Sequence, residues 1–312
     1  MKGEKMTGNQ YFNNTKLIRE LVNKETDNEP FIVRLNDEAS LNVKYYSTDL
    51  ISHSITQWDI VVLDSIYSLQ QHGYDLFSMN LLCQFITGNF QKKMTTKNFE
   101  SIINSINKLC KIYIQIDFTE ERQKYVTAIN KQFICEGPLL SLEIKGNSIN
   151  MKEVSPLYRY ANSNHQIINY PMEILSTKGR VSDTTQSIIL KRYVVQKIFQ
   201  IISSNKIKSN KLSLIWWDHK EKKYKGLFPE LGYLPDDSVA WRKKKYQILK
   251  IIKNVLEVTK EKNIIIDFCE YRKNDGTGLN LPINGYKIFY EKKDVNKKEK
   301  TVSRKRKNGN TK

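Results

Sequence analysis

The sequence predicts an α+β protein built from two similar domains. Its 312 residues suffice for two domains at about 150 residues each. In the first half, three segments with helical spacing of apolar residues are followed by segments in which apolar and polar residues alternate, as in strands. The second half has the same order of elements. Apolar residues make up 39% of the chain and charged residues 27%, a composition that permits a packed core.

In the first half, the expected helices begin and end at residues typical of helix termini. The caps and stops are Thr56 and Gly73 for the first helix, Ser78 and Gly88 for the second, and Thr95 or Thr96 at the start of the third. Alternation over Ile112–Asp117 then predicts a strand, and 124–134 and 139–144, separated by Gly137 and Pro138, are further strand-like stretches. Three helices followed by a β ribbon are the order of a winged-helix domain.

The second half repeats this order without recognisable sequence identity to the first. The expected elements are a long helix capped by Asp183, a hairpin over 212–227, a helical turn at 229–231 ended by Gly232, a long helix over 239–260 capped at Asp236, Asp237 or Ser238, and strands over 264–271 and 286–291. We therefore predict two winged-helix domains in tandem.

The expected organisation has five parts. They are a lead-in over residues 1–50, with a short helix near 15–23 and strands near 31–34 and 41–46, a first winged-helix domain over 51–146, a connector over 147–182 with a helix at 156–164, a second winged-helix domain over 183–291, and a disordered basic tail over 292–312.

Basic residues are concentrated in the second half of the chain. The net charge is +18, of which residues 1–150 contribute −1 and residues 151–312 contribute +19. This asymmetry indicates a polyanionic partner for the second half, nucleic acid before membrane. The alternative is a soluble basic protein that binds nucleic acid only incidentally.

The helix over 239–260 is the expected recognition helix. On a helical wheel its apolar arc holds Trp241, Ile248, Leu249, Ile252, Val255, Leu256 and Thr259. The remaining surface supplies charged and amide groups that suit phosphates and base edges. The candidate DNA-binding residues of this helix are Arg242, Lys243, Lys244, Lys245, Tyr246, Gln247, Lys250, Lys253 and Asn254. The alternative is an ordinary solvated helix face.

Two other segments supply weaker candidates for DNA contact. The third helix of the first domain has a nearly neutral polar face, so it either contacts DNA or forms a protein interface. Its candidates are Lys97, Ser101, Asn104 and Lys108. Lys273 begins the Gly- and Asn-rich loop 273–285, the expected wing tip.

No pattern in the sequence predicts catalysis, a cofactor or a metal site. The four cysteines are far apart without CxxC spacing, as expected of reduced thiols in a cytoplasmic protein. The four histidines are isolated, no phosphate-binding P-loop occurs, and no apolar run is long enough to cross a membrane. Asp59 and Asp64 share a helix but face apart, which favours roles as helix caps or surface charges over a metal-binding pair. Trp216 and Trp217 alternate across a strand, so we expect one of them in the core, with packing favoured over base stacking.

Several stretches resemble the tandem winged-helix replication initiators of plasmids and phages, the initiator Rep proteins. The resemblance covers residues 50–291 and is carried by TQWDIVVLDSIYSL (56–69), FESIINSINKLCKIYIQID (99–117), PLYRYANSNHQIINYPMEIL (156–175), SIILKRY (187–193) and LGYLPDDSVAWRKKK (231–245). It implies binding to repeated origin sites as a monomer, dimers in autoregulation, and major-groove contact by the second domain. The lead-in and the hairpin at 212–227 depart from the pattern.

The leading hypothesis is a non-enzymatic replication initiator that binds double-stranded origin repeats, helps to open the origin and recruits the host helicase or its loader. A homodimer is expected to act in autoregulation. No membrane partner is expected. The alternative is a winged-helix transcriptional repressor or partition protein. An enzyme ranks third.

Overall fold

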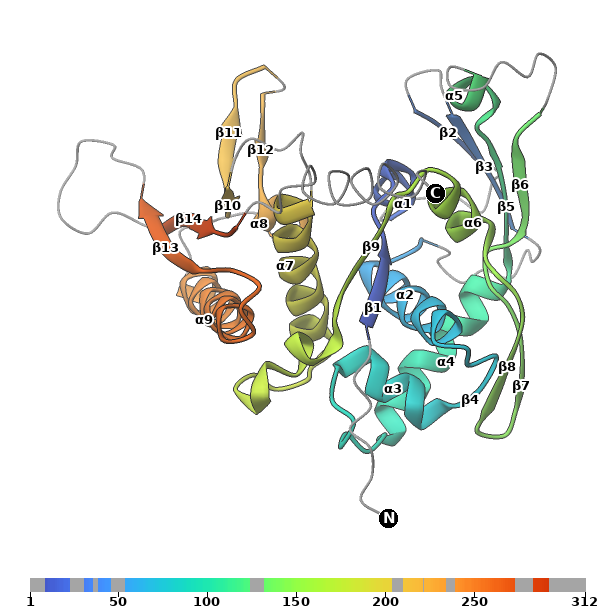
Figure 1. The fold of residues 1–312 in the computed structure, drawn as a ribbon, viewed down its shortest axis with the longest axis horizontal. Coiled ribbons are helices and arrows are strands. Elements are labelled where there is room, and N and C mark those ends of the chain that lie inside the picture. The colour runs from blue at the N-terminus through green and yellow to red at the C-terminus, as the bar shows by residue number, and fades with distance from the viewer. Residues whose placement is uncertain are drawn as a thin grey trace, which may run out of the picture. The chain divides into compact units, whose positions relative to one another are not determined.

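The computed structural model describes residues 9–22, 31–35, 39–45, 54–123, 132–203, 210–220, 222–233, 239–272 and 283–291. The fold is mixed α+β, with several small antiparallel sheets (Figure 1). The chain divides into two compact units. The first unit comprises Met1–Phe199 and Asp237–Val258, and the second comprises Gln200–Asp236 and Thr259–Lys312.

The elements of the N-terminal two thirds of the chain are β1 (Asn9–Asn13), α1 (Lys16–Leu21), β2 (Phe31–Leu35), β3 (Ala39–Tyr45), α2 (Gln57–Gln71), β4 (Leu76–Ser78), α3 (Met79–Thr87), α4 (Thr96–Cys110), β5 (Ile112–Asp117), α5 (Thr119–Gln123), β6 (Ile134–Pro138), β7 (Ser141–Lys145), β8 (Ser148–Glu153), α6 (Pro156–Ser163), β9 (Ile167–Pro171), the 3-10 helix η1 (Met172–Gly179) and α7 (Thr185–Ser203). They are followed by β10 (Lys211–Ser213), β11 (Trp216–Asp218), β12 (Lys223–Lys225), α8 (Leu227–Glu230), α9 (Val239–Glu261), β13 (Asp267–Arg272) and β14 (Ile283–Phe289).

Helices α2 and α3 start and stop where the sequence predicts. Thr56 caps α2 in a reciprocal box, because its backbone N–H donates to Asp59 Oδ2 at 2.8 Å while the Asp59 N–H donates to the Thr56 hydroxyl at 3.3 Å. The Ser78 hydroxyl caps α3, and Gly88 ends it at a left-handed φ of 68°. A Cβ on Gly88 would lie 2.6 Å from the Met172 carbonyl oxygen, so close packing also requires glycine there.

Helix α4 packs with its apolar stripe inward. Thr95 caps the helix, and Ile102, Ile106 and Leu109 are buried in the hydrophobic core of the first unit. The stripe has the i, i+4, i+7 spacing of one helix face. Strand β5 follows directly, with alternating buried and half-buried residues as its period of two predicts.

The expected lead-in and connector are integral to the sheets of the first unit. Strand β3 pairs with β5, with Val43 opposite Ile114, in the four-stranded sheet β2-β3-β5-β6. Strand β1 pairs with β9 of the connector, with Tyr11 opposite Asn169. The sequence predicts α1, α6 and the β2–β3 pair, but not β1 or its pairing with β9.

The order of strand pairing is the same in two places along the chain. The short strand β4, which follows α2, pairs with β8, and β8 pairs with β7. The short strand β10, which follows α7, pairs with β14, and β14 pairs with β13. The intervening elements differ: α3, α4, β5, α5 and β6 lie between β4 and β7 in the sequence, whereas β11, β12, α8 and α9 lie between β10 and β13.

Three local expectations from the sequence are wrong. Thr184, and not Asp183, caps α7, because Thr184 and Ser187 exchange hydrogen bonds while Asp183 pairs with Lys191. Residues 137 and 138 lie inside β6, since an antiparallel edge strand tolerates proline. Residues 212 and 213, expected in the hairpin, belong to β10 and pair with β14, so the hairpin shortens to β11 and β12.

Both adjacent tryptophans are exposed, although one of them was expected in the core. Trp216 is 47% exposed and Trp217 is 43% exposed. The physical reason is that β11 and β12 form a separate two-stranded ribbon, to which no other described strand is added. Asp59 and Asp64 also differ in part from expectation: Asp59 is a cap, but both carboxylates are buried and neither is a surface charge.

Several expectations fall outside the described residues. They concern Lys273, the loop 273–282, the cap at 236–238, the stretch 124–131 and the tail 292–312. Within the described residues, no helix is long and apolar enough to span a bilayer. The same part of the chain contains no group of three or more His, Cys, Asp and Glu side chains that could hold a metal ion.

Candidate nucleic-acid interface

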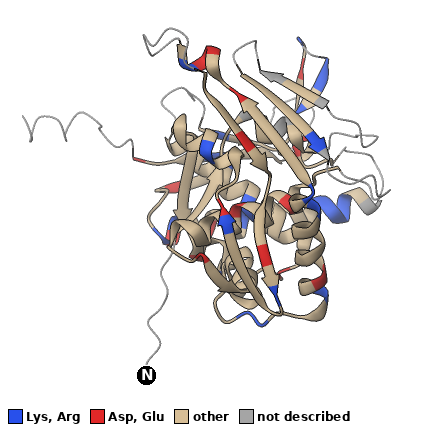
Figure 2. Cartoon of the chain, turned by 90° about the vertical axis from the view of Figure 1, so that its right-hand side faces the viewer, with Lys and Arg blue, Asp and Glu red and all other residues tan. Residues whose placement is uncertain are grey.

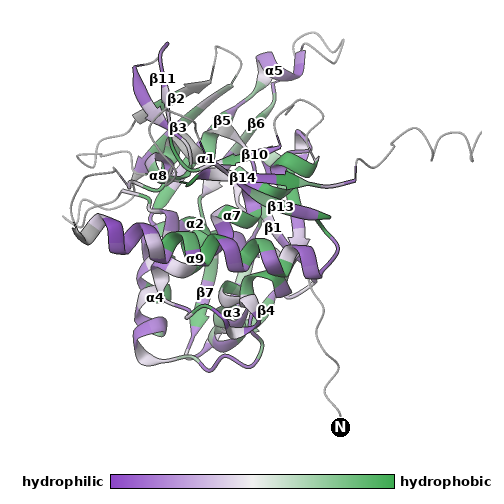
Figure 3. Cartoon of the chain, turned by 90° about the vertical axis from the view of Figure 1, so that its left-hand side faces the viewer, coloured by the Kyte–Doolittle hydropathy of each residue, from purple (hydrophilic) through white to green (hydrophobic). Residues whose placement is uncertain are grey.

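Helix α9 separates a buried apolar face from an exposed basic face. The buried side chains are Ile248, Ile252, Val255, Leu256, Val258 and Thr259. The exposed side chains include Arg242, Lys243, Tyr246, Gln247, Lys250 and Lys253. Figure 3 faces this helix and shows hydrophilic residues over its first turns and hydrophobic bands further along. The phase of the wheel predicted from the sequence is confirmed.

Five residues of this face line an open hollow of about 670 Å³. They are Arg242, Lys243, Tyr246, Gln247 and Lys250. Tyr246 is the most exposed large apolar side chain among the described residues, at 71%. A concave surface with guanidinium, ammonium, amide and phenol groups suits phosphate oxygens and base edges together.

Three further candidates on α9 are less accessible. Lys244 and Lys245 are half-buried, and burial lowers the pKa of Lys245. Asn254 is also half-buried, and its side-chain amide donates to the Lys250 carbonyl oxygen at 2.7 Å. Because this bond uses an amide proton, Gln247 is better placed than Asn254 to make a bidentate contact with a base.

One of the two acidic residues of α9, Glu257, lies beside a basic partner. Glu257 accepts a hydrogen bond from Arg180 at 3.3 Å. An α-helix rises about 1.5 Å per residue. Glu257 lies more than two helical turns beyond Gln247, so its charge is distant from the hollow. The face over Arg242–Lys250 therefore carries only basic and neutral side chains.

The candidates on α4 divide into two groups. Lys97 and Asn104 are exposed, and Ser101 is half-buried. Lys108 instead donates to Asp59 Oδ2 at 2.5 Å and to the Ser54 carbonyl oxygen. Its ammonium group therefore stabilises the buried Asp59 carboxylate inside the first unit.

Charges on the strands of the first unit are mixed in sign. The side that carries β5 to β8 shows acidic and basic residues interspersed (Figure 2). Lys145 and Lys152 both pair with Glu143, and these pairs lower the pKa of the Glu143 carboxyl. Among the described residues of these strands, basic side chains alternate with acidic ones, in contrast to the face of α9.

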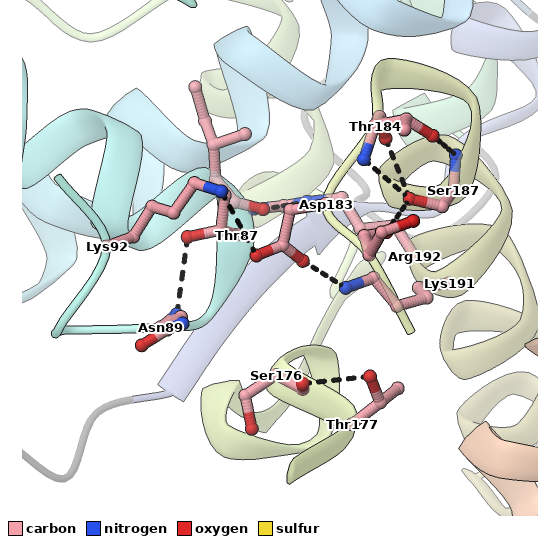
Figure 4. A network of polar contacts seen from close by, with 12 residues as sticks. Thr87, Asn89, Lys92, Ser176, Thr177, Asp183, Thr184, Ser187, Lys191 and Arg192 are labelled. Atoms are coloured by element: carbon pink, nitrogen blue, oxygen red, sulfur yellow. Dashed lines mark hydrogen bonds and ion pairs between the residues drawn. The ribbon is translucent and has the colours of Figure 1, made fainter. Parts of the chain in front are cut away.

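Polar contacts hold the start of α7 against the segment after α3 (Figure 4). Asp183 accepts from Lys191 at 2.7 Å and lies 3.7 Å from the Lys92 ammonium. Burial lowers the pKa of Lys191, and Asp183 opposes that shift. The Lys92 ammonium, on the segment after α3, is therefore close to an acidic partner.

Comparison with known proteins identifies no family for this chain. No protein-family model matches it, and no curated protein matches its sequence. The chain is similar to a crystal structure of domains 2 and 3 of RctB in selenomethionine form, with a TM-score of 0.41 and 13% identity over 87% of this chain and 94% of that one. A second crystal structure of RctB domains 2–3 gives a TM-score of 0.43 and 12% identity over 90% of this chain and 98% of that one.

Proposed function

We propose that this chain is a non-enzymatic protein that binds duplex DNA sequence-specifically and initiates replication at repeated origin sites. The observation that carries the proposal is the exposed face of α9, where Arg242, Lys243, Tyr246, Gln247 and Lys250 line one open hollow. The net charge of +19 in residues 151–312 supports a polyanionic ligand for this face.

Helix α9 would enter the major groove, which is about 12 Å wide and admits an α-helix. Lysines such as Lys243 and Lys250 would position the helix by contacting phosphates. Phosphate contacts carry no information about the base sequence. Gln247 and Arg242 would read base edges, since glutamine suits adenine and arginine suits guanine. The buried Ile252 and Val255 hold the helix without touching DNA.

We also propose that both halves are winged-helix domains. The support is the shared pairing order, in which the first strand joins the last strand in β4-β8-β7 and again in β10-β14-β13. In this proposal α4 and α9 are equivalent helices. The exposed Lys97 and Asn104 on α4 would add contacts from the first domain, or support a homodimer.

Initiation, as distinct from simple DNA binding, is proposed from the sequence resemblance to plasmid and phage initiators. An initiator must open an A·T-rich segment beside its sites and recruit the host helicase or its loader. A repressor or partition protein needs neither step, so maintenance of a replicon separates the two functions.

The test is a complementation experiment with a binding control. A replicon that lacks its own initiator and carries the DNA next to this gene is supplied with the chain in trans. We expect maintenance with the native chain and loss with Gln247→Ala combined with Arg242→Ala, while duplex selection recovers a direct repeat from that DNA. Specific binding to an inverted repeat in the gene's promoter, without maintenance, would instead assign a repressor. Absence of specific duplex binding would refute both.

A further inference from the structure

The hairpin β11–β12 carries exposed aromatic side chains that duplex binding by α9 does not use. Trp216, Trp217 and Tyr224 are 47%, 43% and 50% exposed. In Figure 1 the hairpin stands out from the three-stranded sheet β10-β14-β13 of the same unit. Exposure of three large aromatics on six strand residues is costly in water, at about 25 cal/mol for each Å² of apolar surface. It therefore indicates a partner for this ribbon.

The strand register places these rings on both faces of the ribbon. Trp217 lies opposite Tyr224, and their ring centroids are 4.8 Å apart in an edge-to-face arrangement. Trp216 lies opposite Lys225, whose ammonium is 5.8 Å from the indole centroid. Since side chains alternate along a strand, Trp216 and Lys225 share one face and the Trp217–Tyr224 pair occupies the other.

The basic residues of the hairpin surround these rings. Residues 216–225 read WWDHKEKKYK and contain four lysines against two acidic residues. Lys223 lies opposite Asp218, and the Lys225 ammonium lies 2.6 Å from an Asp218 carboxylate oxygen. This pair orients Lys225 over Trp216, and the excess of lysines gives the ribbon a net positive charge.

The apolar residues of this segment differ between its base and its exposed ribbon. Leu212, Leu214, Leu227 and Phe228, which flank the ribbon in the sequence, are all buried. The ribbon itself contains no aliphatic hydrophobic residue, only tryptophan and tyrosine. Tryptophan and tyrosine are also common at protein interfaces, but lysine is depleted there, so flat rings among lysines favour nucleobases and phosphates.

We propose that the hairpin β11–β12 is a binding site for single-stranded DNA. Unpaired bases would stack on Trp216 and on the Trp217–Tyr224 pair, while lysines of the hairpin contact the backbone phosphates. In a duplex, each base is already stacked between its neighbours, so these rings select single strands. The site shares no residue with α9. Only its use, to hold a strand of an opened origin, rests on the proposed initiator function.

The experiment measures single-strand and duplex affinity on the same full-length chain. The probes are a fluorescein-labelled oligothymidylate and a labelled duplex that carries the selected repeat. In Trp216→Ala combined with Trp217→Ala, we expect the Kd for the oligothymidylate to rise about 5- to 150-fold for each lost stack. The Kd for the duplex should stay unchanged. The oligothymidylate should also quench tryptophan emission in the native chain, and much less in Trp216→Phe combined with Trp217→Phe.

Two controls keep the result interpretable. Phe289→Ala removes an exposed ring of the same unit that also has an ammonium group nearby, that of Lys287 at 5.3 Å, and it should leave the oligothymidylate Kd unchanged. The Phe double variant retains aromatic rings, so it should bind the oligothymidylate more tightly than the Ala variant and show whether the ribbon is folded.

Three results would overturn the proposal. One is an oligothymidylate Kd that does not change in the Ala variant, and another is an equal loss of single-strand and duplex binding. The third is that the Ala variant fails to maintain the replicon although its affinity for the oligothymidylate is intact. That result would assign the hairpin to a protein partner. Failure of specific duplex binding in the native chain would refute the function of α9 and leave the hairpin measurement valid.

Discussion

Arg192 on α7 donates a hydrogen bond from Nη2 to the Ser65 hydroxyl on α2 at 2.7 Å, and both side chains are buried. The same nitrogen also donates to the Phe85 and Ile86 carbonyl oxygens at the end of α3. Asp64, next to Ser65, lowers the cost of burying this charge by its own negative charge when ionised. A single guanidinium therefore joins α7 to α2 and α3 within the first unit.

Replacing Arg192 with methionine should destabilise the first unit. The Ser65 hydroxyl and the two carbonyl oxygens would lose a charged donor, and Asp64 would lose its opposite charge. We expect a loss of about 3–5 kcal/mol, as for removal of one partner of a buried ionic cluster. Urea denaturation followed by circular dichroism measures this loss. Gln196→Ala on the same helix is the matched control and should stay within about 0.5 kcal/mol of the native chain.

The contribution of Asp64 to the stability of the native chain should fall as the pH rises from about 4 to 7. Burial raises the pKa of this carboxyl to about 7, although hydrogen bonds from the Tyr158 hydroxyl and the Asn13 backbone N–H oppose the shift. In that window the folded chain holds a proton that the unfolded chain has released, so each step up in pH favours unfolding.

The comparison that isolates this contribution uses Asp64→Asn, which keeps an oxygen acceptor for Tyr158 but cannot ionise. The free energy of unfolding of the native chain relative to this variant should decrease from pH 4 to pH 7 and level off above about pH 7. Urea midpoints at several pH values measure it. A constant difference across this range would show that Asp64 titrates at an ordinary pKa.

Gln247 and Ile252 should separate DNA recognition from folding on α9. Gln247→Ala should relax specificity at one base position at a cost of about 1–3 kcal/mol, with little change in stability, because the side chain is exposed. Ile252 is fully buried, so Ile252→Ala should cost about 2–5 kcal/mol of stability through lost burial and a cavity. Melting temperature and binding to specific and scrambled duplexes are measured together. Early melting of the Gln247 variant with intact specificity would refute the assignment of this face.

Lys108 and Lys97 should behave differently although both lie on α4. Lys108→Ala removes the cation beside Asp59, whose carboxylate is 2% exposed, and should cost about 1–3 kcal/mol of stability. Lys97 is exposed, so Lys97→Ala should leave the melting temperature unchanged. If α4 contacts DNA, the Lys97 variant should reduce the slope of log affinity against log salt by about 1. An unchanged slope would exclude Lys97 from the interface.

The sequence alone predicts the elements that depend on near neighbours in the chain. The caps at Thr56 and Ser78 follow from hydrogen bonds within one helical turn, and the basic face of α9 follows from a period of 3.6 residues. These features are confirmed because each is decided by residues a few positions apart. The α+β class follows from the same local patterns.

The tertiary structure decided which of these residues remain available on the surface. Lys108 is a candidate DNA contact from the sequence, yet its ammonium lies beside the carboxylate of Asp59 from a distant part of the chain. Trp216 and Trp217 show a core-like alternation, yet they belong to a ribbon with both faces exposed. Arg192 and Gln10 meet in the core across 182 residues of sequence. No periodicity encodes such meetings, because burial and charge pairing depend on which surfaces the folded chain brings together.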